Sequence, residues 1–255
     1  MSHIESDDTN RRRFLGQLVV GAAAVATASC AKAQAAAPPP APAQPPNSGQ
    51  TVATASTAAH STPPAKQSWD LSWTEKLTGE HRQVFDSPEI GDGMVFHHAR
   101  TYYAHFGEVY NLKDADLRAV LVIRHHGIPM VLGDSIWEKY DFIGKEAKLK
   151  DPTTGKWTRR NPFMNAKPGD KYSLVWPDGT LDALIGRGAI VLACNMAFMH
   201  FSTTVATRTN QPTDAVVNEC KAALVPGVTL MPSGIFAVIR AEEGGCHYLR
   251  ATSMG

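Results

Sequence analysis

The sequence predicts an α/β protein with a single folded domain, in which an open, mainly parallel β-sheet carries helices on both faces. Two observations predict it. Short apolar runs rich in β-branched residues alternate with segments of helical periodicity, and the apolar runs end in polar residues or glycine. The clearest runs are Leu117–Ile123, 189–194 and 227–231. Strands that alternate with helices pair in parallel, because each helix returns the chain to the starting edge of the sheet.

The remaining elements follow from the same two periodicities. Met94, Val95, Ala99, Tyr102 and Phe106 recur at helical spacing within 91–110. The same pattern predicts further helices at 135–143, at 181–187, from the end of the second apolar run through Thr207, at 213–224 and at 235–243, and further strands at 81–86 and 247–251. The domain is therefore expected over 69–255.

The N-terminal segment is typical of an export signal. Polar residues 1–10 precede Arg11-Arg12-Arg13-Phe14-Leu15, and an Ala-rich apolar run follows over 18–28. A charged start, a short apolar run and small residues beyond it make a signal peptide, and the paired arginines predict the twin-arginine route over 1–35. The apolar run is shorter than the roughly 20 residues that span a bilayer. We expect a periplasmic or otherwise extracytoplasmic protein without a transmembrane helix in the mature chain.

Two fates of the signal stay open. The small-x-small pattern at Ala31-Lys32-Ala33 and Ala33-Gln34-Ala35 suits cleavage. Cys30 follows small residues and resembles a lipoprotein processing site, so a lipid anchor there is the alternative. Residues 36–68 are rich in Ala and Pro and lack large apolar side chains, which predicts a disordered linker.

Composition and motifs exclude several classes of function. The formal net charge is +1, without the basic excess of a nucleic-acid-binding protein. No Gly-x-Gly-x-x-Gly turn, P-loop or Gly-x-Ser-x-Gly elbow occurs, and no cofactor is predicted. A basic insertion at about 144–172 is either a solvated loop or a lid that attracts an anionic ligand or acidic partner. Its basic residues are Lys145, Lys148, Lys150, Lys156, Arg159, Arg160, Lys167 and Lys171.

Polar residues follow three of the predicted strands. They are His125 and His126 after the first, Cys194 and Asn195 at the end of the second, and Ser233 and Gly234 after the third, where a helix begins. Ligands of open parallel sheets bind beyond the carboxyl ends of the strands, and a helix N-terminus attracts anions. We therefore expect Cys194 to share a crevice with His125 and the 232–234 turn.

The thiol of Cys194 has two interpretations. It is a nucleophile or persulfide carrier if a cationic group favours its thiolate, and otherwise a buried structural cysteine. Cys220 and Cys246 are the other cysteines of the mature domain, and no Cys-x-x-Cys motif occurs. His98 and His105 share a helix face, so a metal or haem site is a further alternative. Their spacing matches no zinc motif, and no metal ligand is assigned.

Three segments, in their order and spacing, resemble the DsrE/DsrF-like superfamily. They are 117–127, then Leu184-Ile185-Gly186-Arg187-Gly188 leading to Cys194-Asn195-Met196-Ala197, then 224–238. In that fold a strand ends with a cysteine after a glycine-bearing helix, and a late Gly-Val strand leads to another helix. The resemblance covers about 86–251.

The superfamily includes sulfur-relay proteins, in which a cysteine carries persulfide sulfur. The resemblance therefore implies Cys194 as the carrier, a small sulfur-containing or anionic ligand, and a homo-oligomer. Relay members are typically cytoplasmic, whereas an export signal is predicted for this chain. A non-catalytic ligand-binding or accessory subunit of the same fold is the alternative function.

Overall fold

The computed structural model describes residues 68–167, 170, 172 and 174–252. The expected signal peptide, Cys30 and the linker up to residue 67 lie outside the described residues, as does Lys171 of the basic insertion. Within the described part, no helix is long and apolar enough to cross a membrane.

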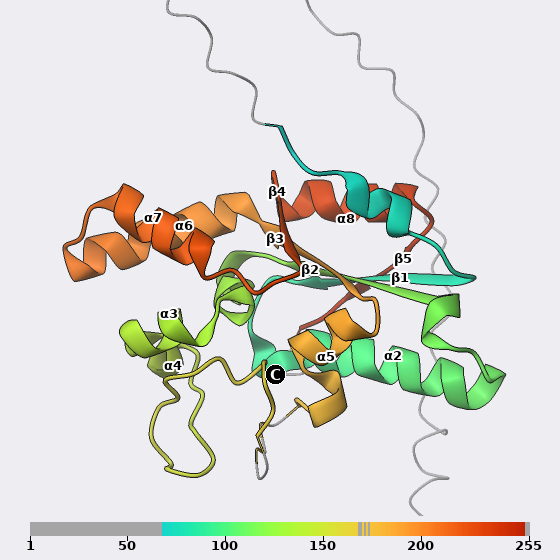
Figure 1. The fold of residues 1–255 in the computed structure, drawn as a ribbon, viewed down its shortest axis with the longest axis horizontal. Helices are drawn as coiled ribbons and strands as arrows, with labels where there is room; N and C mark the ends of the chain where they lie inside the picture. Colours follow the sequence, from blue (N-terminus) through green and yellow to red (C-terminus); the bar gives the residue numbers. More distant parts are fainter. Residues whose placement is uncertain (1–67, 168–169, 171, 173, 253–255) are drawn as a thin grey trace, which may run out of the picture. The chain divides into compact units, whose positions relative to one another are not determined.

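A sheet of five strands forms the centre of the domain (Figure 1). The strands are β1 (His81–Ser87), β2 (Leu117–Ile123), β3 (Ile190–Cys194), β4 (Val228–Met231) and β5 (His247–Arg250), in the order β4-β3-β2-β1-β5. Every neighbouring pair is parallel. The predicted α/β fold with an open parallel sheet is confirmed, and each predicted strand occurs within one residue of its expected bounds at either end.

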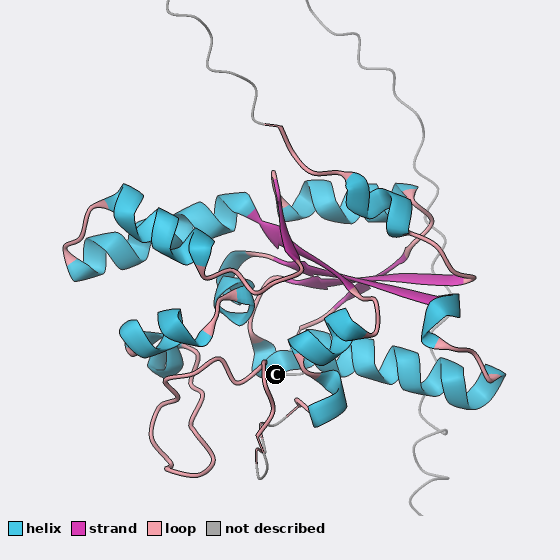
Figure 2. Cartoon of the chain, in the orientation of Figure 1, coloured by secondary structure: helices cyan, strands magenta, loops and turns pink. Residues whose placement is uncertain are grey.

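Alternate residues of the central strand β2 serve opposite faces of the sheet. Val120 and Val122 pack with Trp73 and Ala237, which come from η1 (Ser72–Lys76) and α8 (Gly234–Glu243). Leu121 joins a larger apolar cluster on the other face, together with residues of α2 (Met94–Tyr110) and α5 (Leu181–Gly186). Figure 2 shows these helices on the two sides of the sheet. Both faces are thus covered, as parallel sheets require.

The remaining elements connect these layers. They are η2 (Gly91–Gly93), η3 (Asp114–Asp116), η4 (His125–Val131), α3 (Asp134–Lys139), α4 (Phe142–Glu146), η5 (Pro177–Gly179), α6 (Asn195–Thr209) and α7 (Thr213–Ala222). The helix predicted at 135–143 is two helices, because Tyr140 takes a non-helical backbone conformation (φ −108°, ψ 68°) that ends α3. The hydroxyl of Tyr140 donates to Glu219 of α7 at 2.7 Å, which holds the break in place.

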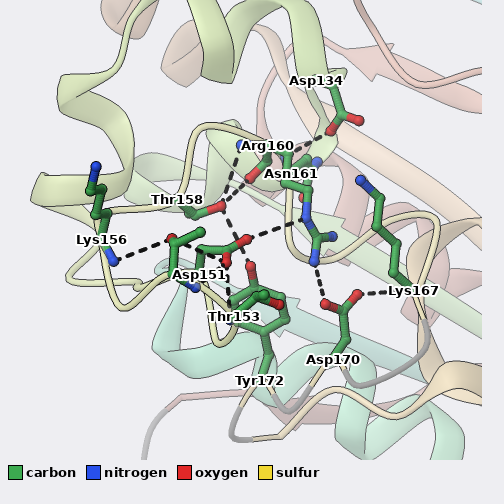
Figure 3. A network of polar contacts seen from close by, with 11 residues as sticks. Asp134, Asp151, Thr153, Lys156, Thr158, Arg160, Asn161, Lys167, Asp170 and Tyr172 are labelled. Atoms are coloured by element: carbon green, nitrogen blue, oxygen red, sulfur yellow. Dashed lines mark hydrogen bonds and ion pairs between the residues drawn. The ribbon is translucent and has the colours of Figure 1, made fainter.

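The segment after α4 is a packed loop held to the domain. Asn161 is fully buried, and its side-chain amide donates to the carbonyl oxygens of Met130 and Leu132 at 2.8 Å each. Its backbone N–H donates to Asp134 at 2.8 Å (Figure 3). A buried amide with this many partners fixes the loop against η4 and α3, because breaking the contacts would leave buried polar atoms unpaired.

Acidic partners neutralise the most buried basic side chain of this loop. Arg160 forms ion pairs with Asp170 and Asp151, and its guanidinium lies 5.4 Å from the centre of the Tyr172 ring (Figure 3). Arg159 donates to the carbonyl oxygen of Glu138 at 2.8 Å. These arginines are engaged within the loop and with α3.

Candidate functional site

A cavity of about 650 Å³ opens at the carboxyl edge of the sheet. The segments that follow four strands contribute to its wall. Ile90 comes after β1; Arg124, His125, His126 and Pro129 after β2; Cys194, Met196, Ala197, His200, Phe201 and Thr204 from the end of β3 and α6; Ser233, Gly234 and Ile235 after β4; and Ile143, Glu146 and Ala147 from α4 and its end. This volume lies in the range of small-molecule sites.

Five of the six predicted site residues line this cavity. They are Cys194, His125, His126, Ser233 and Gly234. Asn195, the first residue of α6, does not line it. None of the described basic side chains of the insertion lines it either; only Glu146 and Ala147 of that region do. No contact between these basic side chains and the cavity therefore supports the interpretation of the insertion as a lid.

Cys194 is both the last residue of β3 and the N-cap of α6. Its Sγ accepts the backbone N–H of Ala197 at 3.4 Å, and the residue is 5% exposed. The N-terminus of a helix carries a partial positive charge, which favours an anion such as a thiolate. The thiol is thus buried from bulk solvent but directed to a cavity wall beside a helix N-terminus.

Arg124, which the sequence did not single out, brings a guanidinium to the cavity wall, paired with a carboxylate. Its Nε and Nη2 donate to the two carboxylate oxygens of Asp86 at 2.6 and 2.7 Å, and Tyr248 donates its hydroxyl to the same carboxylate at 3.0 Å. These hydrogen bonds with Asp86 raise the pKa of Arg124, and burial opposes the rise. One signal was available, since Arg124 directly follows the apolar strand β2.

The turn before α8 has structural tasks of its own. Ser233 caps the helix, its hydroxyl accepting the N–H of Phe236 at 3.0 Å. A Cβ at Gly234 would lie 2.6 Å from Cδ and 2.9 Å from Cβ of Arg124. Gly234 is one of the predicted ligand-binding residues, and it lines the cavity. The aliphatic part of Arg124 fills the space that a side chain at this position would take.

His125 has a strained backbone at the cavity wall. Its φ is +47°, in the left-handed region that residues with a side chain rarely adopt. Backbone hydrogen bonds on either side impose this turn. The N–H of Arg124 donates to the carbonyl oxygen of Ser87 at 2.9 Å, and the N–H of His126 donates to the carbonyl oxygen of Pro88 at 3.0 Å. Strain of this kind is concentrated at functional sites, where surrounding contacts maintain it.

The other two described cysteines are unsuited to nucleophilic chemistry. Cys220 and Cys246 are buried, and all three described cysteines are free. Burial raises the pKa of Cys220, and it raises the pKa of Cys246 to about 11. A higher pKa leaves less thiolate at neutral pH. Neither thiol lines the 650 Å³ cavity.

Several histidines gather elsewhere, around a second cavity of about 290 Å³. His97, His98 and His105 line it together with Tyr102 and Leu249. Burial lowers the pKa of His98. Within the described ranges, no group of three or more His, Cys, Asp or Glu side chains is arranged to hold a metal ion. The metal and haem alternative gains no support from their geometry.

Comparisons with known proteins add little. No protein-family model matches the chain, and no curated protein matches it significantly. The fold has a distant likeness to a protein of unknown function from Methanobacterium thermoautotrophicum. The TM-score is 0.33 at 16% sequence identity, over 67% of this chain and 99% of that chain. At this distance the likeness supports no functional argument.

Proposed function

We propose that this protein is a sulfur carrier in which Cys194 holds persulfide sulfur. The observation that carries the proposal is the setting of this thiol. It caps α6 at its N-terminus and lines a cavity that Arg124 and the first residues of α8 also line. Helix N-termini and guanidinium groups both favour negative charge, and this cavity has two of the former and one of the latter in its wall. The resemblance to DsrE/DsrF-like proteins adds the expectation of persulfide chemistry.

The step needs no external oxidant. The thiolate of Cys194 attacks the outer sulfur of a donor persulfide, R–S–SH. The new bond joins Sγ to that sulfur, the S–S bond of the donor breaks, and the donor leaves as R–S⁻. The hydrogen of the outer sulfur stays with it, so the products are Cys194–S–SH and a thiolate. Arg124 stabilises the anion present before and after transfer.

Intact-mass measurement tests this proposal. The full chain, with Cys30→Ser in every sample, is incubated with a persulfide donor. Excess reagent is removed, and the intact mass is measured by mass spectrometry. Cys220→Ser and Cys246→Ser should each gain the mass of one sulfur atom, as should the parent. Cys194→Ser should gain none. A persulfide on Cys194→Ser, or none on the parent, contradicts the carrier role.

A non-catalytic ligand-binding or accessory subunit is the second candidate. The cavity volume favours it, because about 650 Å³ suits a bound small molecule whether or not chemistry follows. The two functions differ in one result. A binding subunit retains its ligand when Cys194 is replaced by Ser, and its thiol acquires no sulfur.

The proposed setting is extracytoplasmic, reached by the twin-arginine route. The paired Arg11 and Arg12 before an apolar run support it. That route carries folded proteins, so the domain would reach its native state before export. Whether Cys30 is lipidated or removed with the signal depends on the processing enzyme that acts.

We also propose a homo-oligomer. Apolar side chains on α6 and α8 are exposed around the cavity rim, with Met196 at 68% and Ile235 at 67%. Clustered exposed apolar residues are typical of interaction surfaces. Sedimentation at micromolar concentration tests it, and a monomer alone would contradict it.

A further inference from the structure

The cavity is longer than sulfur transfer to Cys194 requires. Cys194 lies at the N-terminus of α6, and Thr204, ten residues further along, lines the same cavity. A helix rises 1.5 Å per residue, so the wall extends about 15 Å from the thiol. A sulfide ion or a small sulfur oxyanion would occupy only the end at Cys194.

Apolar side chains line the cavity along this whole length. Met196, Ala197 and Ile235 accompany Arg124, His125 and Ser233 at the end near Cys194. Further along, Phe201 of α6 and Ile143 and Ala147 of the α4 region line it. An ion pair between Glu146 and Arg208 holds α4 beside the C-terminal half of α6. The distal part, which we call the slot between α4 and α6, combines this apolar surface with the polar side chains of Glu146, His200 and Thr204.

We propose that the sulfur donor is an organic persulfide whose apolar body lies in the slot between α4 and α6 while its outer sulfur reaches Cys194. This inference rests on the proposed function and names its substrate class. Apolar surface in the slot favours a hydrocarbon body at about 25 cal/mol per Å² buried. The end near Cys194 receives the departing thiolate beside Arg124.

Two persulfides that share the reactive group and differ in their body provide the test. The full chain with Cys30→Ser is treated with methyl persulfide or with a long-chain n-alkyl persulfide, and the rate of sulfur gain on Cys194 is measured. The long-chain donor should react about ten-fold faster at low concentration, which corresponds to about 1.4 kcal/mol of extra binding.

Neighbouring threonines on α6 supply a matched pair of variants. Both Thr203 and Thr204 are exposed, but only Thr204 lines the cavity. Thr204→Trp should fill the slot and abolish the advantage of the long-chain donor, leaving the methyl donor unchanged. Thr203→Trp should change neither rate. Ala147→Trp, on the opposite wall, should repeat the effect of Thr204→Trp.

The outcomes separate this inference from the proposed function. Equal rates for both donors, unaltered by Thr204→Trp, overturn the organic donor and leave the carrier role standing. If Cys194 gains sulfur from neither donor, the carrier role fails. Calorimetry then decides the ligand class, using an unreactive long-chain alkyl methyl thioether and the Cys194→Ser variant. Binding that Thr204→Trp abolishes and Thr203→Trp preserves supports an organic ligand in the slot, and absence of binding overturns it.

Discussion

The guanidinium of Arg124 lies against the carboxylate of Asp86 in a two-point ion pair, with Nε–Oδ1 at 2.6 Å and Nη2–Oδ2 at 2.7 Å. The two residues stand at the carboxyl ends of adjacent strands, and the side chain of Asp86 is 4% exposed. This pair fixes the guanidinium of Arg124 in the wall of the cavity that Cys194 also lines. It also connects the cavity to the sheet edge, because Tyr248 of β5 bonds the same carboxylate.

Replacing Asp86 with Asn should lower both stability and sulfur transfer. Breaking a buried ion pair leaves one charge uncompensated, so we expect a loss of about 3 kcal/mol in the free energy of unfolding, measured with urea. Asp178→Asn is the control. It breaks an ion pair with Arg100 of which the carboxylate is 56% exposed, and should cost at most about 1 kcal/mol. Equal losses in the free energy of unfolding would show that the Asp86–Arg124 pair stabilises the fold no more than the exposed pair does.

Iodoacetamide should distinguish the three described cysteines in the folded protein at neutral pH. All three are buried, but only Cys194 lines the 650 Å³ cavity, and burial raises the pKa values of Cys220 and Cys246. Alkylation depends on thiolate fraction and access, so Cys194 should be labelled first. Peptide mass mapping over time measures the order, with unfolded protein as the control. Early labelling of Cys246 would refute this assignment.

Alkaline pH should destabilise the fold through Cys246. Its pKa is 9.0 ordinarily and about 11 in the folded protein. The unfolded chain therefore releases the proton first. The contribution to stability is complete below pH about 9 and is lost as pH rises to about 11, by roughly 2 kcal/mol. Cys246→Ala should show a flatter decline in urea midpoint over this window. The same slope in both proteins would contradict the prediction.

His125→Gly should stabilise the fold slightly while slowing sulfur transfer. Glycine relieves a left-handed backbone, although its extra freedom in the unfolded chain offsets part of the gain, which leaves about 0.5 kcal/mol. Asn210→Gly is the matched control. Asn210 also has a left-handed backbone (φ +51°), at the end of α6, and it does not line the cavity. Thermal unfolding and the rate of sulfur gain provide the two readouts. If His125→Gly transfers sulfur at the parent rate, the imidazole of His125 plays no part in the reaction.

Replacing Arg11 and Arg12 with Lys should retain the precursor in the cytoplasm. The twin-arginine translocase reads the arginine pair rather than positive charge, and lysine preserves the charge alone. Cell fractionation with antibody detection measures the outcome. Replacing Arg13 by Lys instead is the control and should permit export. Normal export of the double variant would contradict the proposed route.

Much of the site could be predicted because parallel strands bring their carboxyl ends to one edge. Cys194, His125 and Ser233 follow different strands, and the cavity at that edge includes all three. Their roles stay predictions. The packing role of Gly234 could not be predicted from strand order. A glycine at a helix start suits a ligand or a neighbouring side chain equally well, and only the structure shows that the side chain of Arg124 packs against it.

The fold class, the five strands and most helices could be predicted from the sequence, because apolar periodicity and turn residues act over a few neighbouring positions. Only the tertiary structure decided the partners of the polar groups. It set β5 beside β1, which brings Tyr248 to Asp86, and it buried Asn161 against η4, which makes the basic insertion a packed loop. These contacts join residues that are distant along the chain. They depend on strand order and helix packing, and local patterns carry no record of either.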